Sequence, residues 1–187
     1  MRFGRYGISL LALSVLLTLR ARELSAQAQV ISLAATSLSS FSILITSGAT
    51  QTIAGVTDNA VNSFPSPVVI HTAWNVNPGQ TNTVNLVAYF TTPAQALVGG
   101  ATQIPSTRLL GRMLTGIPTT FTAISQNGIG GVGTAGGSLR LYALNISGAN
   151  KNATRTDNLD LQLNLVGFPV LPAGSFTGVL NLRAVTQ

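Results

Sequence analysis

Residues 158–166 read NLDLQLNLV, and this alternation of leucine with polar residues constrains the fold more than any other feature of the chain. Successive side chains of a strand point to opposite faces, whereas a helix would scatter the four leucines around its surface. The pattern therefore predicts a strand with one buried face and one polar face. The inward set is Leu159, Leu161, Leu163 and Leu165, and the outward set is Asp160, Gln162 and Asn164.

The same period-two pattern recurs along the chain and predicts an all-β fold. Further alternating segments lie at residues 41–45, 68–76, 84–90, 139–144 and 176–183. Turn residues such as Asn77-Pro78-Gly79 and Pro172-Ala173-Gly174 separate these segments. One helical turn is expected at 92–97, and Trp74 is assigned to the core. We expect an antiparallel, immunoglobulin-like β-sandwich of about seven to nine strands.

The beginning of the chain has the order of a secretory signal peptide. Arg2 and Arg5 precede an uncharged apolar run at 8–19, and Ala26-Gln27-Ala28 supplies small residues where signal peptidase cleaves. The run is shorter than the roughly 20 residues of a membrane span, so no stable span is expected. We expect a signal peptide over residues 1–28, a single domain over 29–187, and export to the periplasm, the cell surface or the extracellular space.

Charged and metal-binding residues are scarce. Charged residues make up 7% of the chain, which has one histidine and no cysteine. A disulfide scaffold and thiolate metal sites are therefore excluded, and a histidine-rich metal site is not expected. The expected signal peptide supplies half of the net charge of +6, and the remaining basic residues are scattered. No cofactor, metal or nucleic-acid partner is expected.

The motifs that resemble catalytic or nucleotide-binding signatures lack the necessary context. Gly128–Gly133 matches G-x-G-x-x-G, but a strand pattern follows it where a nucleotide site needs a helix, so we expect a hairpin loop. His71 lies within a strand pattern. Asp157 and Asp160 are three residues apart, so a strand places them on opposite faces. We therefore assign no catalytic residue and expect no enzyme.

Two tyrosines are candidates for contact with a partner. Tyr89 and Tyr142 fall on the faces opposite the apolar stripes of their predicted strands, which would expose both rings. Exposed tyrosines favour contact with a glycan or a protein. They support an alternative function as a secreted carbohydrate- or protein-binding module.

The C-terminal segments 156–165 and 171–182 combine an alternating strand with the sequence LPAGSFTG, which opens the last strand. This arrangement resembles the end of secreted bacterial pilin-like sandwiches, among them the spore coat U-like and related fimbrial subunits. Residues 67–90 are similar to secreted bacterial proteins of the same general kind. The chain lacks the cysteine pair that spore coat U-like domains often carry.

The resemblance implies an exported, non-enzymatic subunit of a cell surface, fimbria or matrix that assembles by strand addition. In such subunits an exposed groove accepts a strand from another subunit, so the implied partners are further copies or other surface subunits. The donor would be Val30–Leu38, with Ile31, Leu33 and Ala35 on one face. The same segment is equally compatible with the first strand of a self-complete domain.

Overall fold

The computed structural model describes residues 28–36, 41–79 and 83–187, and only the backbone of Ala28, Gln29, Ala35 and Thr36. The expected signal peptide lies outside the described residues except for Ala28. The strands are β1 (Ala28–Thr36), β2 (Phe41–Ser47), β3 (Thr50–Ala54), β4 (Val61–Ser63), β5 (Val68–Asn75), β6 (Thr83–Tyr89), β7 (Leu97–Gly99), β8 (Thr102–Ile104), β9 (Leu109–Met113), β10 (Thr122–Ala123), β11 (Ser138–Asn145), β12 (Asn152–Asn164) and β13 (Phe176–Thr186). Two 3-10 turns, η1 (Pro93–Gln95) and η2 (Ser106–Arg108), complete the described elements.

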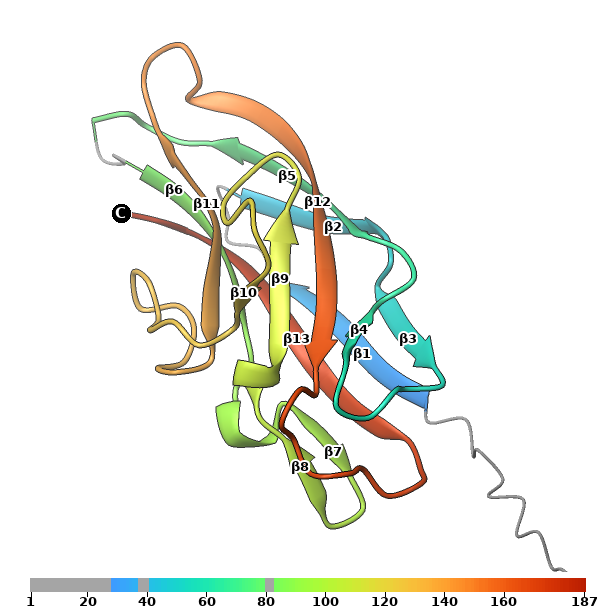
Figure 1. Ribbon diagram of the computed structural model, residues 1–187. Coiled ribbons are helices and arrows are strands. Elements are labelled where there is room, and N and C mark those ends of the chain that lie inside the picture. The colour runs from blue at the N-terminus through green and yellow to red at the C-terminus, as the bar shows by residue number, and fades with distance from the viewer. Residues whose placement is uncertain (1–27, 37–40, 80–82) are drawn as a thin grey trace, which may run out of the picture.

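Two sheets form the layers of a β-sandwich (Figure 1). The seven-stranded sheet, called sheet A, has the order β11-β6-β13-β1-β3, with β7 and β8 attached beside β13. The six-stranded sheet, called sheet B, has the order β10-β9-β12-β5-β2, with β4 attached to β12. The all-β class and the two-sheet architecture predicted from the sequence are confirmed.

The core lies between the sheets and follows the predicted alternation. Leu159, Leu161 and Leu163 of β12 are buried, as are the alternate residues Val68, Ile70, Thr72 and Trp74 of β5. The indole Nε1 of Trp74 donates a hydrogen bond to the backbone oxygen of Asn150 at 2.8 Å. The buried apolar residues of both sheets belong to one large cluster, which is the shared core expected of a sandwich.

The sandwich is not purely antiparallel, because β1 pairs with β13 in parallel. These strands are the first and last of the described chain, so no tight hairpin forces them to run in opposite directions. The predicted number of strands was also too low for the described residues, where thirteen are present. Nine of these have five or more residues, and the shorter ones are β4, β7, β8 and β10.

The glycine-rich loop before β11 covers part of the outer face of sheet A. Val132 of this loop is buried in a small second cluster with Val87 and Val185, against which Ile129 and Tyr89 also pack. As expected from the sequence, a strand follows the G-x-G-x-x-G motif.

No described helix is long and apolar enough to cross a membrane.

Candidate functional site

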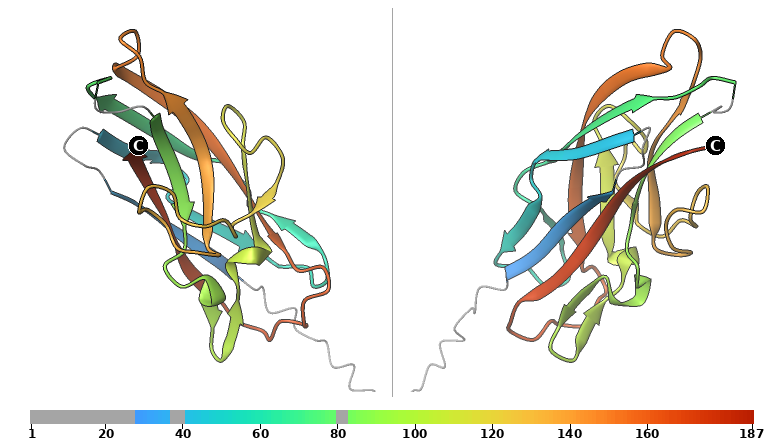
Figure 2. Two further views of the ribbon diagram at one scale, coloured as in Figure 1. Left: turned by 90° about the vertical axis from the view of Figure 1, so that its left-hand side faces the viewer. Right: turned by 180° about the vertical axis from the view of Figure 1, so that it is seen from behind.

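The first strand occupies the interior of sheet A. In parallel register with β13, the pairs of β1 run from Gln29↔Phe176 to Thr36↔Arg183. In antiparallel register with β3, they run from Ala28↔Ala54 to Ser32↔Thr50. The view from behind in Figure 2 shows β1 in blue running beside β13 in red. Sheet A therefore holds β1 by backbone pairing on both edges, and without β1 the strands β13 and β3 would lose their shared neighbour.

The side chains of β1 reinforce this placement. Ile31 is 0% exposed in the core, and Leu33 is half-buried and packs against the same core. The backbone of Ala35 pairs with Leu182, while its side chain lies outside the described residues. Ile31 and Leu33 therefore both point toward the core, as the alternation of the sequence predicts. The fold places this segment as a strand of its own sandwich, and its exchange between chains stays a prediction.

The strands around β1 share an unusual lack of charge. Residues 24–57, which span β1, β2 and β3, contain no charged residue. In the described part, β2 borders sheet B with β5 as its sole partner strand, and Leu44 on β2 is 59% exposed. Sheet edges are usually protected by charge, proline or bulges. The bulge between Ile45 and Ser47 is the one such device that β2 shows.

The structure places Tyr142 in the core, and its predicted exposure is wrong. A bulge between Arg140 and Tyr142 inserts one extra residue into β11, so that Leu141 and Tyr142 are both buried. The ring of Tyr142 is 3% exposed. Tyr89 is half-buried beside the small cluster under the glycine-rich loop. The two tyrosines do not form a shared exposed platform for a glycan or a protein.

A buried polar cluster surrounds Tyr142 between the two sheets. Asp157, whose side chain is 0% exposed, accepts hydrogen bonds from Arg155 Nε at 2.6 Å and from Thr115 Oγ1 at 2.6 Å. The Arg155 guanidinium lies 4.8 Å from the centroid of the Tyr142 ring and also donates to the backbone oxygen of Thr115. The hydrogen bond to Asp157 raises the pKa of Arg155 above its ordinary value.

The hydroxyl groups of Tyr142 and Thr72 are the unsatisfied polar groups of this cluster among the described residues. Burial raises the pKa of Tyr142 to about 12, and the neighbouring Thr72 hydroxyl offsets only part of the rise. Neither hydroxyl meets the geometry of a hydrogen bond to any partner among the described residues. Unpaired buried hydroxyls are costly, so these two groups reduce the stability that the cluster contributes to the core.

A polar cleft lies on the opposite, outer face of β12. The sequence Phe64-Pro65-Ser66-Pro67 separates β4 from β5, both of which pair with β12. Proline has no N–H to donate, so two prolines at alternate positions interrupt the ladder at this point. Across the gap, the backbone N–H of Phe64 still donates to the oxygen of Leu161 at 3.1 Å. The interruption leaves a cleft of about 230 Å³ over Asp160, Leu161 and Gln162.

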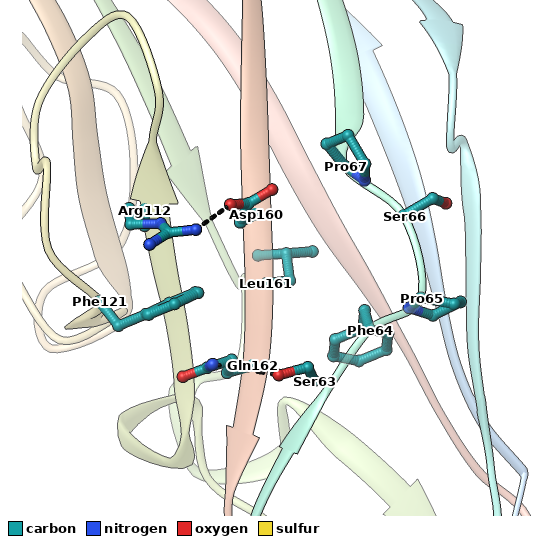
Figure 3. Close-up of a pocket in the computed structure, with 10 residues that line it drawn as sticks. All are labelled: Ser63, Phe64, Pro65, Ser66, Pro67, Arg112, Phe121, Asp160, Leu161 and Gln162. Carbon is teal, nitrogen blue, oxygen red and sulfur yellow. Dashed lines mark hydrogen bonds and ion pairs between the residues drawn. The ribbon is translucent and has the colours of Figure 1, made fainter.

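The walls of this cleft carry paired polar groups (Figure 3). On one side, Arg112 of β9 donates to Asp160 Oδ2 at 2.5 Å, and its guanidinium lies 4.5 Å from the centroid of the Phe121 ring. On the floor, Gln162 Nε2 donates to Ser63 Oγ at 3.1 Å. The alternating sequence pattern does not predict this site. The interruption of an alternating pattern by Pro65 and Pro67 was the signal that could have shown it.

In the described part of the chain, His71, Asp157 and Asp160 do not come together at one place. His71 lies on the outer face of sheet B, where its Nδ1 is 3.1 Å from Thr156 Oγ1. Asp157 and Asp160 occupy opposite faces of β12, as predicted. No group of three His, Cys, Asp or Glu residues that could hold a metal ion occurs among the described residues.

Comparison with known proteins adds no neighbour. A scan against protein-family models, a search of curated proteins and a search of solved structures each found no significant match.

Proposed function

We propose that this protein is an exported structural subunit with an immunoglobulin-like sandwich, and that copies join by exchanging β1. The observation that carries the proposal is the position of β1, which pairs on both edges inside sheet A although it is the first described strand. Four residues, 37–40, connect it to β2, which lies in the other sheet. Exchange of an identical element between copies is a low-cost route to assembly, because the exchanged strand makes the same contacts.

The chemistry of β1 supports this proposal. Its buried Ile31 and half-buried Leu33 alternate with exposed Ser32 and Ala34, so the strand carries the side-chain pattern by which an added strand is recognised. The parallel register with β13 covers eight residue pairs, which supplies main-chain hydrogen bonds along most of the strand. The absence of charge over residues 24–57 removes repulsion between the β1 segments of different copies.

Cysteine trapping tests the exchange directly, because the natural chain has no cysteine. Ser32 of β1 and Val179 of β13 are register partners and are both exposed. Equal amounts of the S32C and V179C variants are unfolded, mixed, refolded and oxidised. Exchange predicts a disulfide between chains that joins peptides 32 and 179, identified by mass spectrometry.

The control pair is A73C with T154C, which are register partners of β5 and β12 and do not involve β1. This pair should form a bond only when both cysteines are in one chain. The proposal fails if the S32C and V179C mixture stays uncrosslinked while the S32C/V179C double variant closes within each chain. That result would identify a self-complete domain. Electron microscopy of the crosslinked product then distinguishes closed dimers from filaments.

A function as a carbohydrate- or protein-binding module through Tyr89 and Tyr142 loses its structural basis, because Tyr142 is buried. A different candidate binding site, the cleft over Asp160, lies on the outer face of β12.

A further inference from the structure

The cleft on the outer face of β12 combines a hollow with several polar side chains. Its volume of about 230 Å³ is below the 300–1,000 Å³ typical of pockets for drug-sized ligands, so it suits a ligand of one small ring. The groove between residues 99–102 and 172–176 is larger, but mostly small residues line it and they offer few directional contacts. The cleft is therefore the stronger candidate for specific recognition.

Charge in the cleft selects a neutral ligand. Arg112 and Asp160 are the charged residues among those that line it, and they neutralise each other through their ion pair at 2.5 Å. An anion would have to compete with Asp160 for the guanidinium, and a cation would have to compete with Arg112 for the carboxylate. A ligand without net charge leaves this pair intact and avoids both costs.

Unused hydrogen-bonding capacity in the cleft selects a ligand rich in hydroxyl groups. Asp160 uses Oδ2 for Arg112, and Oδ1 has no hydrogen-bond partner among the described residues. In Figure 3 the second carboxylate oxygen points away from Arg112, toward the side of the cleft where Pro67 lies. Gln162 uses its Nε2 for Ser63, while its Oε1 accepts no hydrogen bond within the described chain. In Figure 3 the free oxygen of Gln162 lies on the side of β9, so these two acceptors, two residues apart on one strand face, are spread across the cleft, and hydroxyls on opposite sides of a small polyol match this spread.

The opposite wall is apolar and stiff. Pro65 and Pro67 both line this wall, and in Figure 3 Pro67 lies on the side toward which the free carboxylate oxygen points; the fixed backbone angles of the two prolines hold the wall in place. A pyranose ring has both a set of hydroxyls and a C–H face. We propose that this cleft binds one neutral hexopyranose residue, with Asp160 and Gln162 accepting hydroxyl protons from its two sides and Pro67 contacting its C–H face.

Amide-detected NMR titration of the protein tests the proposal with defined probes. Methyl β-D-glucopyranoside, methyl α-D-mannopyranoside and methyl β-D-galactopyranoside are the neutral sugars. Glucuronate, glucosamine and a blocked neutral tetrapeptide are the comparison probes. At least one neutral sugar should shift the amide signals of residues 160–162 and 63–67 saturably, with a dissociation constant on the order of 1 mM, as expected for a few hydrogen bonds.

Variants on one strand face provide the matched comparison. D160N should weaken binding of that sugar roughly ten-fold or more, since hydrogen bonds to charged groups are the stronger ones, and Q162A should weaken it several-fold. N158A is the control, because Asn158 lies on the same outer face of β12 outside the residues that line the cleft. Unchanged amide spectra elsewhere in each variant verify that the fold is retained.

Three outcomes would overturn the proposal. The first is the absence of saturable shifts at residues 160–162 and 63–67 with all three neutral sugars. The second is an equal loss of binding in N158A and D160N. The third is tighter binding of glucuronate, glucosamine or the tetrapeptide than of every neutral sugar, which would assign the cleft to another ligand class. Because none of these variants lies in β1 or β13, the result is independent of strand exchange.

Discussion

The inner and outer faces of β12 carry the same arrangement of residues in two environments. On the inner face, Arg155 pairs with Asp157 at 2.6 Å and lies over the ring of Tyr142. On the outer face, Arg112 pairs with Asp160 at 2.5 Å and lies over the ring of Phe121. The side chain of Asp157 is 0% exposed and that of Asp160 is 22% exposed. The same kind of ion pair is therefore buried by packing on one face and remains accessible to solvent on the other.

The largest expected effect is at the inner pair. Substitution of Asp157 by alanine leaves Arg155 without its carboxylate and Thr115 without its acceptor, in a site partly removed from water. Breaking a buried pair in this way costs about 3–5 kcal/mol. Equilibrium unfolding in urea should show this loss as a lower midpoint. A loss below about 1 kcal/mol would contradict the structural role assigned to the inner pair.

The same contrast between faces applies to β1. Ile31→Ala removes a side chain that is 0% exposed and should lower the free energy of unfolding by about 2–5 kcal/mol. Ser32→Ala, on the exposed face of the same strand, should change it by less than about 0.5 kcal/mol. Urea unfolding of the two variants side by side measures the difference. Equal effects would show that β1 does not sit in the core as described.

High pH should lower the free energy of unfolding, because the buried Tyr142 on the inner face resists ionisation. Its pKa in the folded protein is raised to about 12 from 10.0, so the folded state binds this proton more tightly than the unfolded state. The contribution of Tyr142 to the free energy of unfolding is fully present below pH 10. It is lost as the pH rises toward 12, and the total loss is about 3 kcal/mol. Urea midpoints measured from pH 9 to 12 check the slope.

Two phenylalanine variants separate the contribution of Tyr142 from other titrations. Tyr142→Phe should flatten the decline, and at neutral pH it should raise stability by about 1 kcal/mol, because it removes an unpaired buried hydroxyl. Tyr89→Phe is the control and should leave the decline in place. An unchanged slope in Tyr142→Phe would assign the pH dependence to another group.

The smallest effect is expected at the outer pair. Asp160→Ala breaks an ion pair that solvent screens on both sides, so the free energy of unfolding should change by about 0–1 kcal/mol. The difference between this variant and the natural protein should shrink further in 1 M salt, where charges are screened within about 3 Å. A loss as large as that of Asp157→Ala would remove the distinction between the two faces.

Local alternation predicted most of the fold. Burial of Leu159, Leu161 and Leu163 and the separation of Asp157 from Asp160 follow from the period of two along β12, which needs no knowledge of the neighbouring strands. The parallel pairing of β1 with β13 could not be predicted in this way. It joins segments at opposite ends of the chain, and their register depends on the finished sheets.

The candidate sites were less predictable than the strands. Tyr142 was assigned to the outside because one residue inserted at a bulge reverses the facing of the residues that follow, and alternation does not reveal the bulge. The cleft escaped prediction for a different reason. Its residues come from β4, β9, β12, Phe121 and the segment between β4 and β5, so it exists only after these separate segments meet. Pro65 and Pro67 marked an interruption but not what lay across it.

The pairing of the first and last described strands also determines when β1 can reach its place during folding. Among the described strands β1 is synthesised first, yet its partner β13 is synthesised after all the others. Closing so long a loop is slow, and folding rates fall as contacts become more distant in sequence. In the exchange proposed above, β1 of a neighbouring chain competes for the same position during that interval, at a strength set by its local concentration. A high local concentration of newly made chains would therefore favour joined chains over closed monomers.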